Sequence, residues 1–160
     1  MLFDFQVNGF AGIDFQSDDL GLNDLQQAVR ALHRHRTTAI LLTLITDRVD
    51  ALCRKLERLE ALRSRDPVIA GTIRGYHLEG PWISVEKGYH GAHPPHLASL
   101  PDLADYRRLR DAAGGNLRLI TLAPELEGAD ELIAAATRDG LRIGLGHTNA
   151  PEAAIDGAIR

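Results

Sequence analysis

Short apolar runs alternate with longer amphipathic stretches along this chain. Each run is closed by Gly, Pro, Asp or Asn, as expected of strands that are buried on both faces of a parallel sheet. The predicted strands are Leu2 to Asn8, Ala39 to Thr46, Ile73 to Glu79, Leu117 to Ala123 and Leu141 to His147. Strands that alternate with helical stretches in this way predict an α/β fold with a parallel sheet.

The intervening stretches have helical periodicity. After Asp47, leucines recur at positions 52, 56, 59 and 62, a spacing of three or four residues that places them on one side of a helix. Apolar residues at positions 25, 29 and 32 predict an earlier helix, for which Asn23 is the expected N-cap. The stretch from Pro81 to about Leu100 has neither period, and irregular segments of this length are usually functional.

Candidate chemistry lies at two predicted strand ends. His77 and Glu79 share a face of their strand because side chains alternate, and His147 ends another strand. A carboxylate and an imidazole at neighbouring strand ends suggest a divalent metal held between them. On pattern alone Glu79 could instead be an ion-paired or solvated strand-end residue, and His147 a capping residue.

Four segments, taken together and in order, carry a family resemblance. They are Asp4–Gly9 with Gly12 and Asp14, His77–Pro81 followed by Gly91–Pro94, Thr121–Glu125, and Gly146–Ala150. With these segments the chain resembles the N-acetylglucosamine-6-phosphate deacetylases of the amidohydrolase superfamily, over nearly its whole length.

The resemblance implies a partial TIM-type (β/α)8 barrel with about five βα units of the metal-dependent amidohydrolase fold. The chain has 160 residues, whereas a complete barrel needs roughly 250. We therefore expect residues 1–160 to form a single, incomplete barrel domain that lacks the family's N-terminal β-domain and its C-terminal barrel strands.

The resemblance also assigns roles to individual residues. It implies that Glu79 and His147 bind a divalent metal, with zinc as the expected ion, and that Ala92 and His93 contact the substrate. The loop that holds His93 is longer than the commonest family pattern. The resemblance places the catalytic Asp, which acts as acid and base, and a third metal ligand beyond Arg160, so no catalytic residue is assigned within the chain.

Three further residues are expected to support the metal ligands without binding the metal themselves. His77 is expected to hydrogen-bond near them, because the family does not use this histidine as a ligand. Gln6 and Asn8 stand where many amidohydrolases place a His-x-His pair for a second metal, and amides replace imidazole poorly at zinc. One metal per site is therefore expected, with a loop-fixing role for these amides as the alternative.

Composition limits the class of partner and the compartment. The formal net charge is −4 and the isoelectric point 5.9, so nothing favours a nucleic-acid or membrane surface. The single cysteine, Cys53, excludes an intramolecular disulfide, and the start of the chain lacks the regions of a signal peptide, which favours the cytoplasm. An open barrel has unpaired edges, so self-association or pairing with a complementary barrel segment is expected.

Three functional hypotheses follow. The favoured one is hydrolysis of N-acetylglucosamine 6-phosphate, a small amino-sugar phosphate, to glucosamine 6-phosphate and acetate. The second is another amidohydrolase reaction, on N-acyl amino acids or cyclic amides. The third is a non-catalytic barrel fragment. If the first holds, this chain by itself is expected to be an inactive portion of the enzyme.

Overall fold

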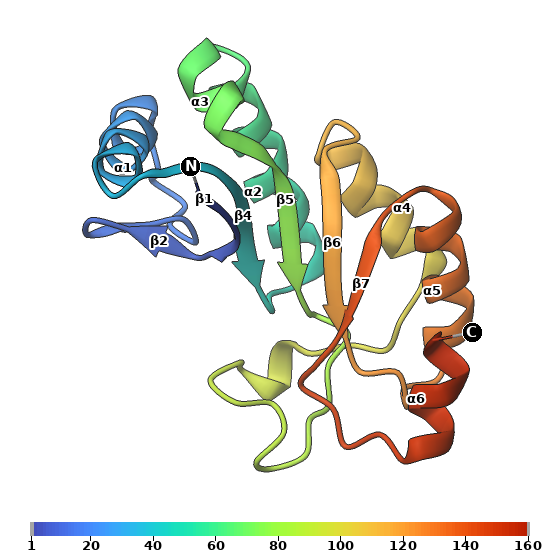
Figure 1. Cartoon of the computed structure of the whole chain (residues 1–160). Coiled ribbons are helices and arrows are strands. Elements are labelled where there is room, and N and C mark those ends of the chain that lie inside the picture. Colours follow the sequence, from blue (N-terminus) through green and yellow to red (C-terminus); the bar gives the residue numbers. More distant parts are fainter. Residues whose placement is uncertain (1, 160) are drawn as a thin grey trace.

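Five parallel strands form one curved sheet in the computed structural model, which describes residues 2–159 (Figure 1). The strands lie in the order β1 (Leu2–Val7), β4 (Thr37–Ile45), β5 (Ile73–Glu79), β6 (Leu117–Leu122) and β7 (Arg142–Leu145). All neighbouring strands are parallel, with Thr43 opposite His77 and Glu79 opposite Thr121. The predicted α/β partial barrel is confirmed.

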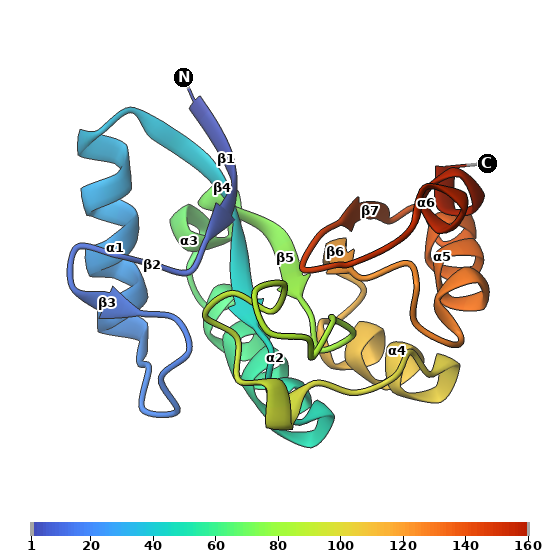
Figure 2. The ribbon, with the colours of Figure 1, turned by 90° about the horizontal axis from the view of Figure 1, so that it is seen from below.

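The helices lie around the outside of the curved sheet (Figure 2). They are α1 (Leu22–Arg34), α2 (Val49–Arg63), α3 (Pro67–Thr72), α4 (Leu103–Ala112), α5 (Ala129–Arg138) and α6 (Glu152–Ile159). Alternate β4 residues, Ile40, Leu42 and Leu44, are fully buried in the same core as the leucine stripe of α2. None of the described helices is long and apolar enough to cross a membrane.

Some local expectations were wrong. The N-cap of α1 is Gly21, not Asn23, because the helix begins at Leu22 and the Asp24 carboxylate accepts a hydrogen bond of 2.8 Å from the Gly21 amide. The sequence pattern also gave no sign of the short ribbon of β2 (Gly9–Phe10) and β3 (Ile13–Asp14). Two-residue strands are too short to show an alternating pattern.

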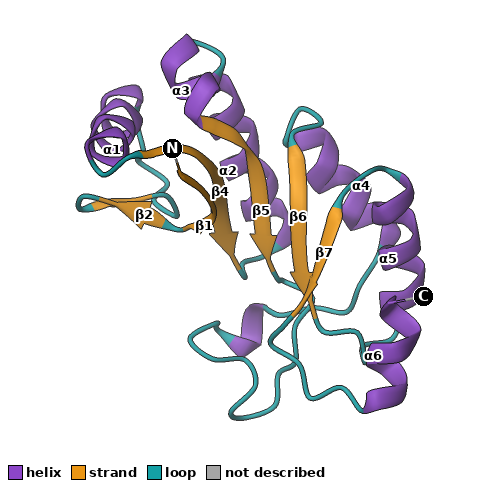
Figure 3. Cartoon of the chain, in the orientation of Figure 1, coloured by secondary structure: helices purple, strands orange, loops and turns teal. Residues whose placement is uncertain are grey.

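The two ends of the inner sheet face differ. The amino end forms a shallow hollow of about 530 Å³ with an apolar floor that includes Phe3, Phe5 and Leu119, and arginine side chains also line it. At the carboxyl end, where the strand arrows end, the loops gather (Figure 3). The long 81–100 segment lies here and contains one short helical turn, η1 (Pro95–Leu97).

Candidate metal and substrate site

Backbone hydrogen bonds fix the start of the 81–100 segment against the strand ends. The Ala123 amide donates to the Trp82 carbonyl at 2.9 Å, just after β6. The Ser84 amide donates to the His147 carbonyl at 2.8 Å, just after β7. The segment is therefore a fixed wall of the carboxyl-end site.

Glu79 and His147 meet at this edge although 68 positions separate them in sequence. Glu79 is the last residue of β5, and His147 lies two residues after β7. The Nε2 atom of His147 is 3.0 Å from Oε1 of Glu79. The backbone of His147 is left-handed, with a φ of 52°, and such conformations outside glycine often mark functional sites.

His93 joins this pair from the 81–100 segment. Its side chain is buried, with Nε2 3.7 Å from Oε2 of Glu79, and its ring centroid is 4.2 Å from that of His147. Ligand atoms of Glu79, His93 and His147 all lie within 4.8 Å of one another. Ala92, the other residue assigned to the substrate, is exposed beside His93. A carboxylate and two imidazoles thus converge on one point.

The electrostatics of this cluster favour an ionised carboxylate. The adjacent His93 ring, together with His147, lowers the pKa of Glu79 to about 2, although burial acts in the opposite direction. Glu79 therefore carries its negative charge across the physiological pH range. An ionised carboxylate beside imidazole nitrogens fits the ligand chemistry of zinc and similar divalent ions.

His77 lies below the cluster on the same face of β5 and is fully buried. Its Nδ1 is 3.2 Å from the Thr43 hydroxyl on β4, and its Nε2 is 2.8 Å from the Thr121 hydroxyl on β6. Burial lowers the pKa of His77 to about 4, against the opposite influence of Glu79. His77 is thus a neutral ring that joins three strands, and it makes no hydrogen bond to the Glu79 side chain.

Gln6 and Asn8 lie on and just after the edge strand β1. Among the described residues, neither side chain hydrogen-bonds to the Glu79 cluster. Their expected place beside a metal therefore stays a prediction. Glu125, which follows β6, accepts hydrogen bonds from the Thr148 hydroxyl and, at 2.7 Å, from the Asn149 amide.

Sequence reasoning missed the groups that orient the cluster. The Thr46 hydroxyl lies 2.8 Å from Nδ1 of His93, and the Tyr89 carbonyl lies 3.3 Å from Nδ1 of His147. Gly80 allows the first contact, because a Cβ there would clash with Oγ1 of Thr46. A threonine at the end of an apolar strand was the one signal of this role in the sequence.

A curved parallel sheet with helices along its outer face is the fold of part of an amidohydrolase barrel. No protein-family model matches the chain. The N-acetylglucosamine-6-phosphate deacetylase of Bos taurus is 36% identical over 162 residues, which cover 98% of this chain and 38% of the bovine protein. The N-acetylgalactosamine-6-phosphate deacetylase of Shewanella sp. strain ANA-3 is 38% identical over 149 residues, covering 92% of this chain and 35% of that protein.

Solved structures give the same result. The structure of a mutant N-acetyl-D-glucosamine-6-phosphate deacetylase from Mycobacterium smegmatis, in complex with N-acetyl-D-glucosamine-6-phosphate, matches with a TM-score of 0.84 and 35% identity. The match covers 98% of this chain and 39% of that one. The chain is therefore homologous to part of the N-acetylglucosamine-6-phosphate deacetylases, and it spans less than half the length of the relatives it matches.

Proposed function

We propose that this chain forms part of a metal-dependent hydrolase that removes the acetyl group of N-acetylglucosamine 6-phosphate in amino-sugar catabolism. The observation that carries the proposal is the convergence of Glu79 Oε1 and His147 Nε2, 3.0 Å apart at the carboxyl end of the sheet. The names of the bovine and mycobacterial relatives support the choice of substrate.

The residues present fit one divalent ion, and we propose zinc. Glu79 and His147 would hold it, and when bound it supplies Lewis acidity together with a water whose pKa is lowered towards neutrality. The ionised state of Glu79 suits this role, because its pKa of about 2 leaves no proton to displace at neutral pH. We propose a single ion per site, since neutral amides stand at Gln6 and Asn8.

We propose the remaining roles as the resemblance implies them. His93 and Ala92 lie on the wall of the site, where His93 Nε2 faces the cluster and can hydrogen-bond to the sugar. His77 keeps the strand that carries Glu79 in register with its neighbours through Thr43 and Thr121. Gln6 and Asn8 support the site from the edge strand.

Amide cleavage also needs a proton donor for the leaving amine. Among the described residues, the cluster holds one carboxylate, Glu79, and the two histidines beside it lower its pKa, so it is unsuited to donate a proton at neutral pH. We propose that the donor is an Asp from sequence beyond Arg160, and that the 160-residue chain alone releases no appreciable acetate. As an incomplete barrel domain in the reducing cytoplasm, it would associate with a copy of itself or with a complementary barrel segment.

Reconstitution tests the proposal. The chain is expressed together with the portion of the bovine relative that it does not match, and acetate release from N-acetylglucosamine 6-phosphate is measured with zinc present. We expect acetate release that depends on both pieces and is lost in the Glu79→Gln variant. Acetate release by the chain alone, near the usual enzyme range of roughly 1 to 1000 per second, would contradict the proposed incompleteness.

Substrate comparison separates the alternatives. N-acetylgalactosamine 6-phosphate is a second candidate, because the Shewanella relative is named for it. Preference for an N-acyl amino acid or a cyclic amide would instead indicate another amidohydrolase. If no zinc binds and no substrate is hydrolysed in the reconstituted complex, the chain is a non-catalytic barrel fragment.

A further inference from the structure

His93 points its free ring nitrogen at the same carboxylate as His147. Nε2 of His93 is 3.7 Å from Oε2 of Glu79, and Nε2 of His147 is 3.0 Å from Oε1. The two rings are therefore directed at different oxygens of one carboxylate. His93 is also the most deeply buried of the three side chains, with 6% of it exposed.

The other ring nitrogen of each histidine is engaged by a neighbouring protein group. The Tyr89 carbonyl can only accept, so the contact with His147 requires a proton on Nδ1 of His147. With a proton on Nδ1, His93 donates to the Thr46 hydroxyl at 2.8 Å, and that hydroxyl donates to the Glu79 carbonyl at 3.3 Å. In the other tautomer, Nδ1 of His93 accepts a hydrogen bond from the Thr46 amide at 3.4 Å.

In the tautomer with a proton on each Nδ1, both Nε2 atoms direct lone pairs towards Glu79. A divalent cation placed among these groups would accept lone pairs from both rings and from the Glu79 carboxylate. A ligand histidine whose other nitrogen donates to a carbonyl or hydroxyl is the usual arrangement at metal sites. Thr46 and Tyr89 supply that second contact.

The spacing and the donor set both fit a metal. Two ligands of a tetrahedral zinc, with bonds of about 2.0 to 2.1 Å, lie roughly 3.4 Å apart. The observed separations from Glu79, 3.0 Å and 3.7 Å, fall on either side of this value. Two histidines and one glutamate also form a known ligand set of catalytic zinc, in which the fourth position stays open.

We propose that, in the substrate-free 160-residue chain, His93 is the third protein ligand of one divalent cation together with Glu79 and His147, in place of the ligand that the resemblance puts beyond Arg160. The ligand role of His93 rests on the proposed metal-dependent function. It extends that function, because His93 then binds the metal before the substrate is bound. The same Nε2 atom serves in succession, first on the ion and then as a hydrogen-bonding partner of the bound sugar.

The test measures metal binding by the 160-residue chain, without turnover. Zinc affinity is measured by competition with a chromophoric chelator, and the cobalt-substituted chain is followed by visible absorption. The variants are His93→Gln, Glu79→Gln and His147→Gln. The control is His96→Gln, because His96 lies exposed in the same loop. Circular dichroism in excess chelator checks that each variant folds.

We expect His93→Gln to weaken zinc binding roughly 10- to 100-fold and to alter the cobalt spectrum, while His96→Gln changes neither. If His93→Gln binds zinc like the parent chain while Glu79→Gln and His147→Gln do not, the ligand role is wrong and the proposed metal site stands. If the parent chain and all variants show the same weak binding, the proposed metal site fails as well.

Two further measurements keep the proposal testable if His93→Gln does not fold. X-ray absorption of the zinc-loaded parent chain should show two imidazole ligands, and a single imidazole would overturn the assignment. Thr46→Val removes the hydroxyl that orients His93 but changes no ligand, and it should weaken zinc binding about 10-fold. Unchanged affinity in this variant would count against the orientation of His93 described above.

Discussion

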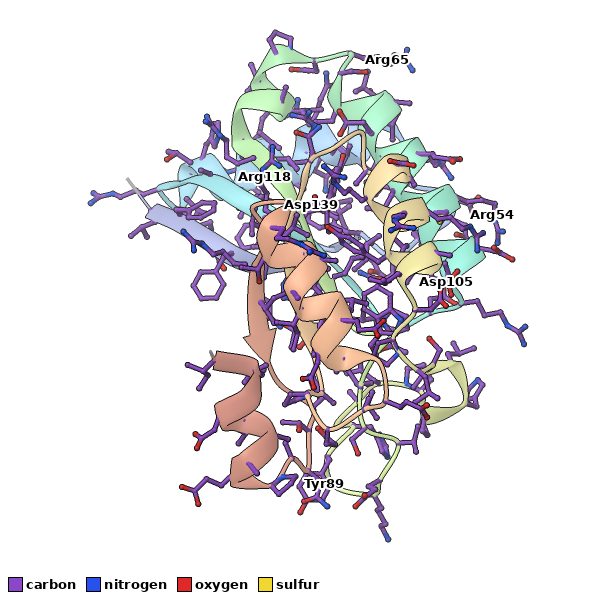
Figure 4. The ribbon with its side chains drawn as sticks, turned by 90° about the vertical axis from the view of Figure 1, so that its right-hand side faces the viewer. Arg54, Arg65, Tyr89, Asp105, Arg118 and Asp139 are labelled. Carbon is purple, nitrogen blue, oxygen red and sulfur yellow. The ribbon has the colours of Figure 1, made fainter. Side chains whose placement is uncertain are left out.

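The two ends of the inner sheet face are built from the same strands but differ in how their side chains are held. At the carboxyl end, Glu79 and the two histidines beside it contact one another and fixed protein groups. At the amino end, Phe3 and Phe5 are exposed, Phe5 by 60%. Figure 4 shows the two ends through the labelled Arg118 above and Tyr89 below.

The difference follows from the cost of burying polar groups. A carboxylate or an imidazole that leaves water must find partners, and Glu79, His93 and His147 are each oriented by more than one contact. The exposed phenylalanines at the amino end carry no polar group that needs a hydrogen-bond partner. The carboxyl end is therefore already organised for a ligand, whereas the amino end offers apolar surface that another protein segment can cover.

The largest expected effect is on metal binding at the carboxyl end. Glu79→Gln removes the anionic ligand but keeps the shape of the side chain, so zinc affinity should fall by more than about 100-fold. Competition with a chelator measures it. Glu125→Gln is the control, because Glu125 lies near the same sheet edge and bonds Thr148 and Asn149 outside the cluster. Equal losses in the two variants would contradict a localised site.

The next effect is a dependence of stability on pH that arises from His77. The unfolded chain binds a proton at this histidine near pH 6.5, whereas the folded chain does so only near pH 4. The unfolded state therefore holds more protons between these values, and stability is full above pH 6.5 and is lost as pH falls towards 4. The loss amounts to roughly 3 kcal/mol.

Urea unfolding of the metal-free chain at several pH values measures this slope. His77→Gln should remove the His77 contribution, and His96→Gln should leave the slope as it is in the parent chain. Identical slopes in the parent chain and in His77→Gln would show that the buried ring does not stay neutral.

A smaller effect is expected from the close contact that orients His93. Gly80→Ala should destabilise the chain by more than about 1 kcal/mol, because Gly80 has a φ of 86° and a Cβ would strike Thr46. Gly88→Ala is a matched control with a φ of 98° and open space around it. Thermal unfolding of both variants separates backbone strain from the clash. Equal destabilisation would show that the contact with Thr46 contributes nothing.

The smallest effect on stability is expected at the amino end. Phe5→Ser should change the free energy of unfolding by less than about 0.5 kcal/mol, because the side chain is largely exposed. It should nevertheless reduce self-association, measured by sedimentation velocity over a range of concentrations, since it removes exposed apolar surface. A large loss of stability without any change in association would show that Phe5 stabilises the fold and does not form a surface for association.

Much of the fold could be read from the chain because each strand is a short buried run between helices. The run Ile73–Glu79 was predicted with its observed bounds, and the others differ by a residue or two at their ends. The first residues of the helices were harder to predict from the sequence. Asn23 has the right chemistry for a cap, yet Asp24 satisfies the amide of Gly21, a choice that depends on where the chain enters the helix.

The sequence by itself determined the parallel α/β order, the place of Glu79 and His147 at strand ends, and the irregular segment that carries His93. These are local properties, since they depend on periodicity and on residue type. Only the tertiary structure decided that His93 turns inward against Glu79, and that Thr46 and Tyr89 orient the two rings. Such contacts join residues tens of positions apart, and their geometry depends on sheet curvature and loop path, which no local pattern encodes.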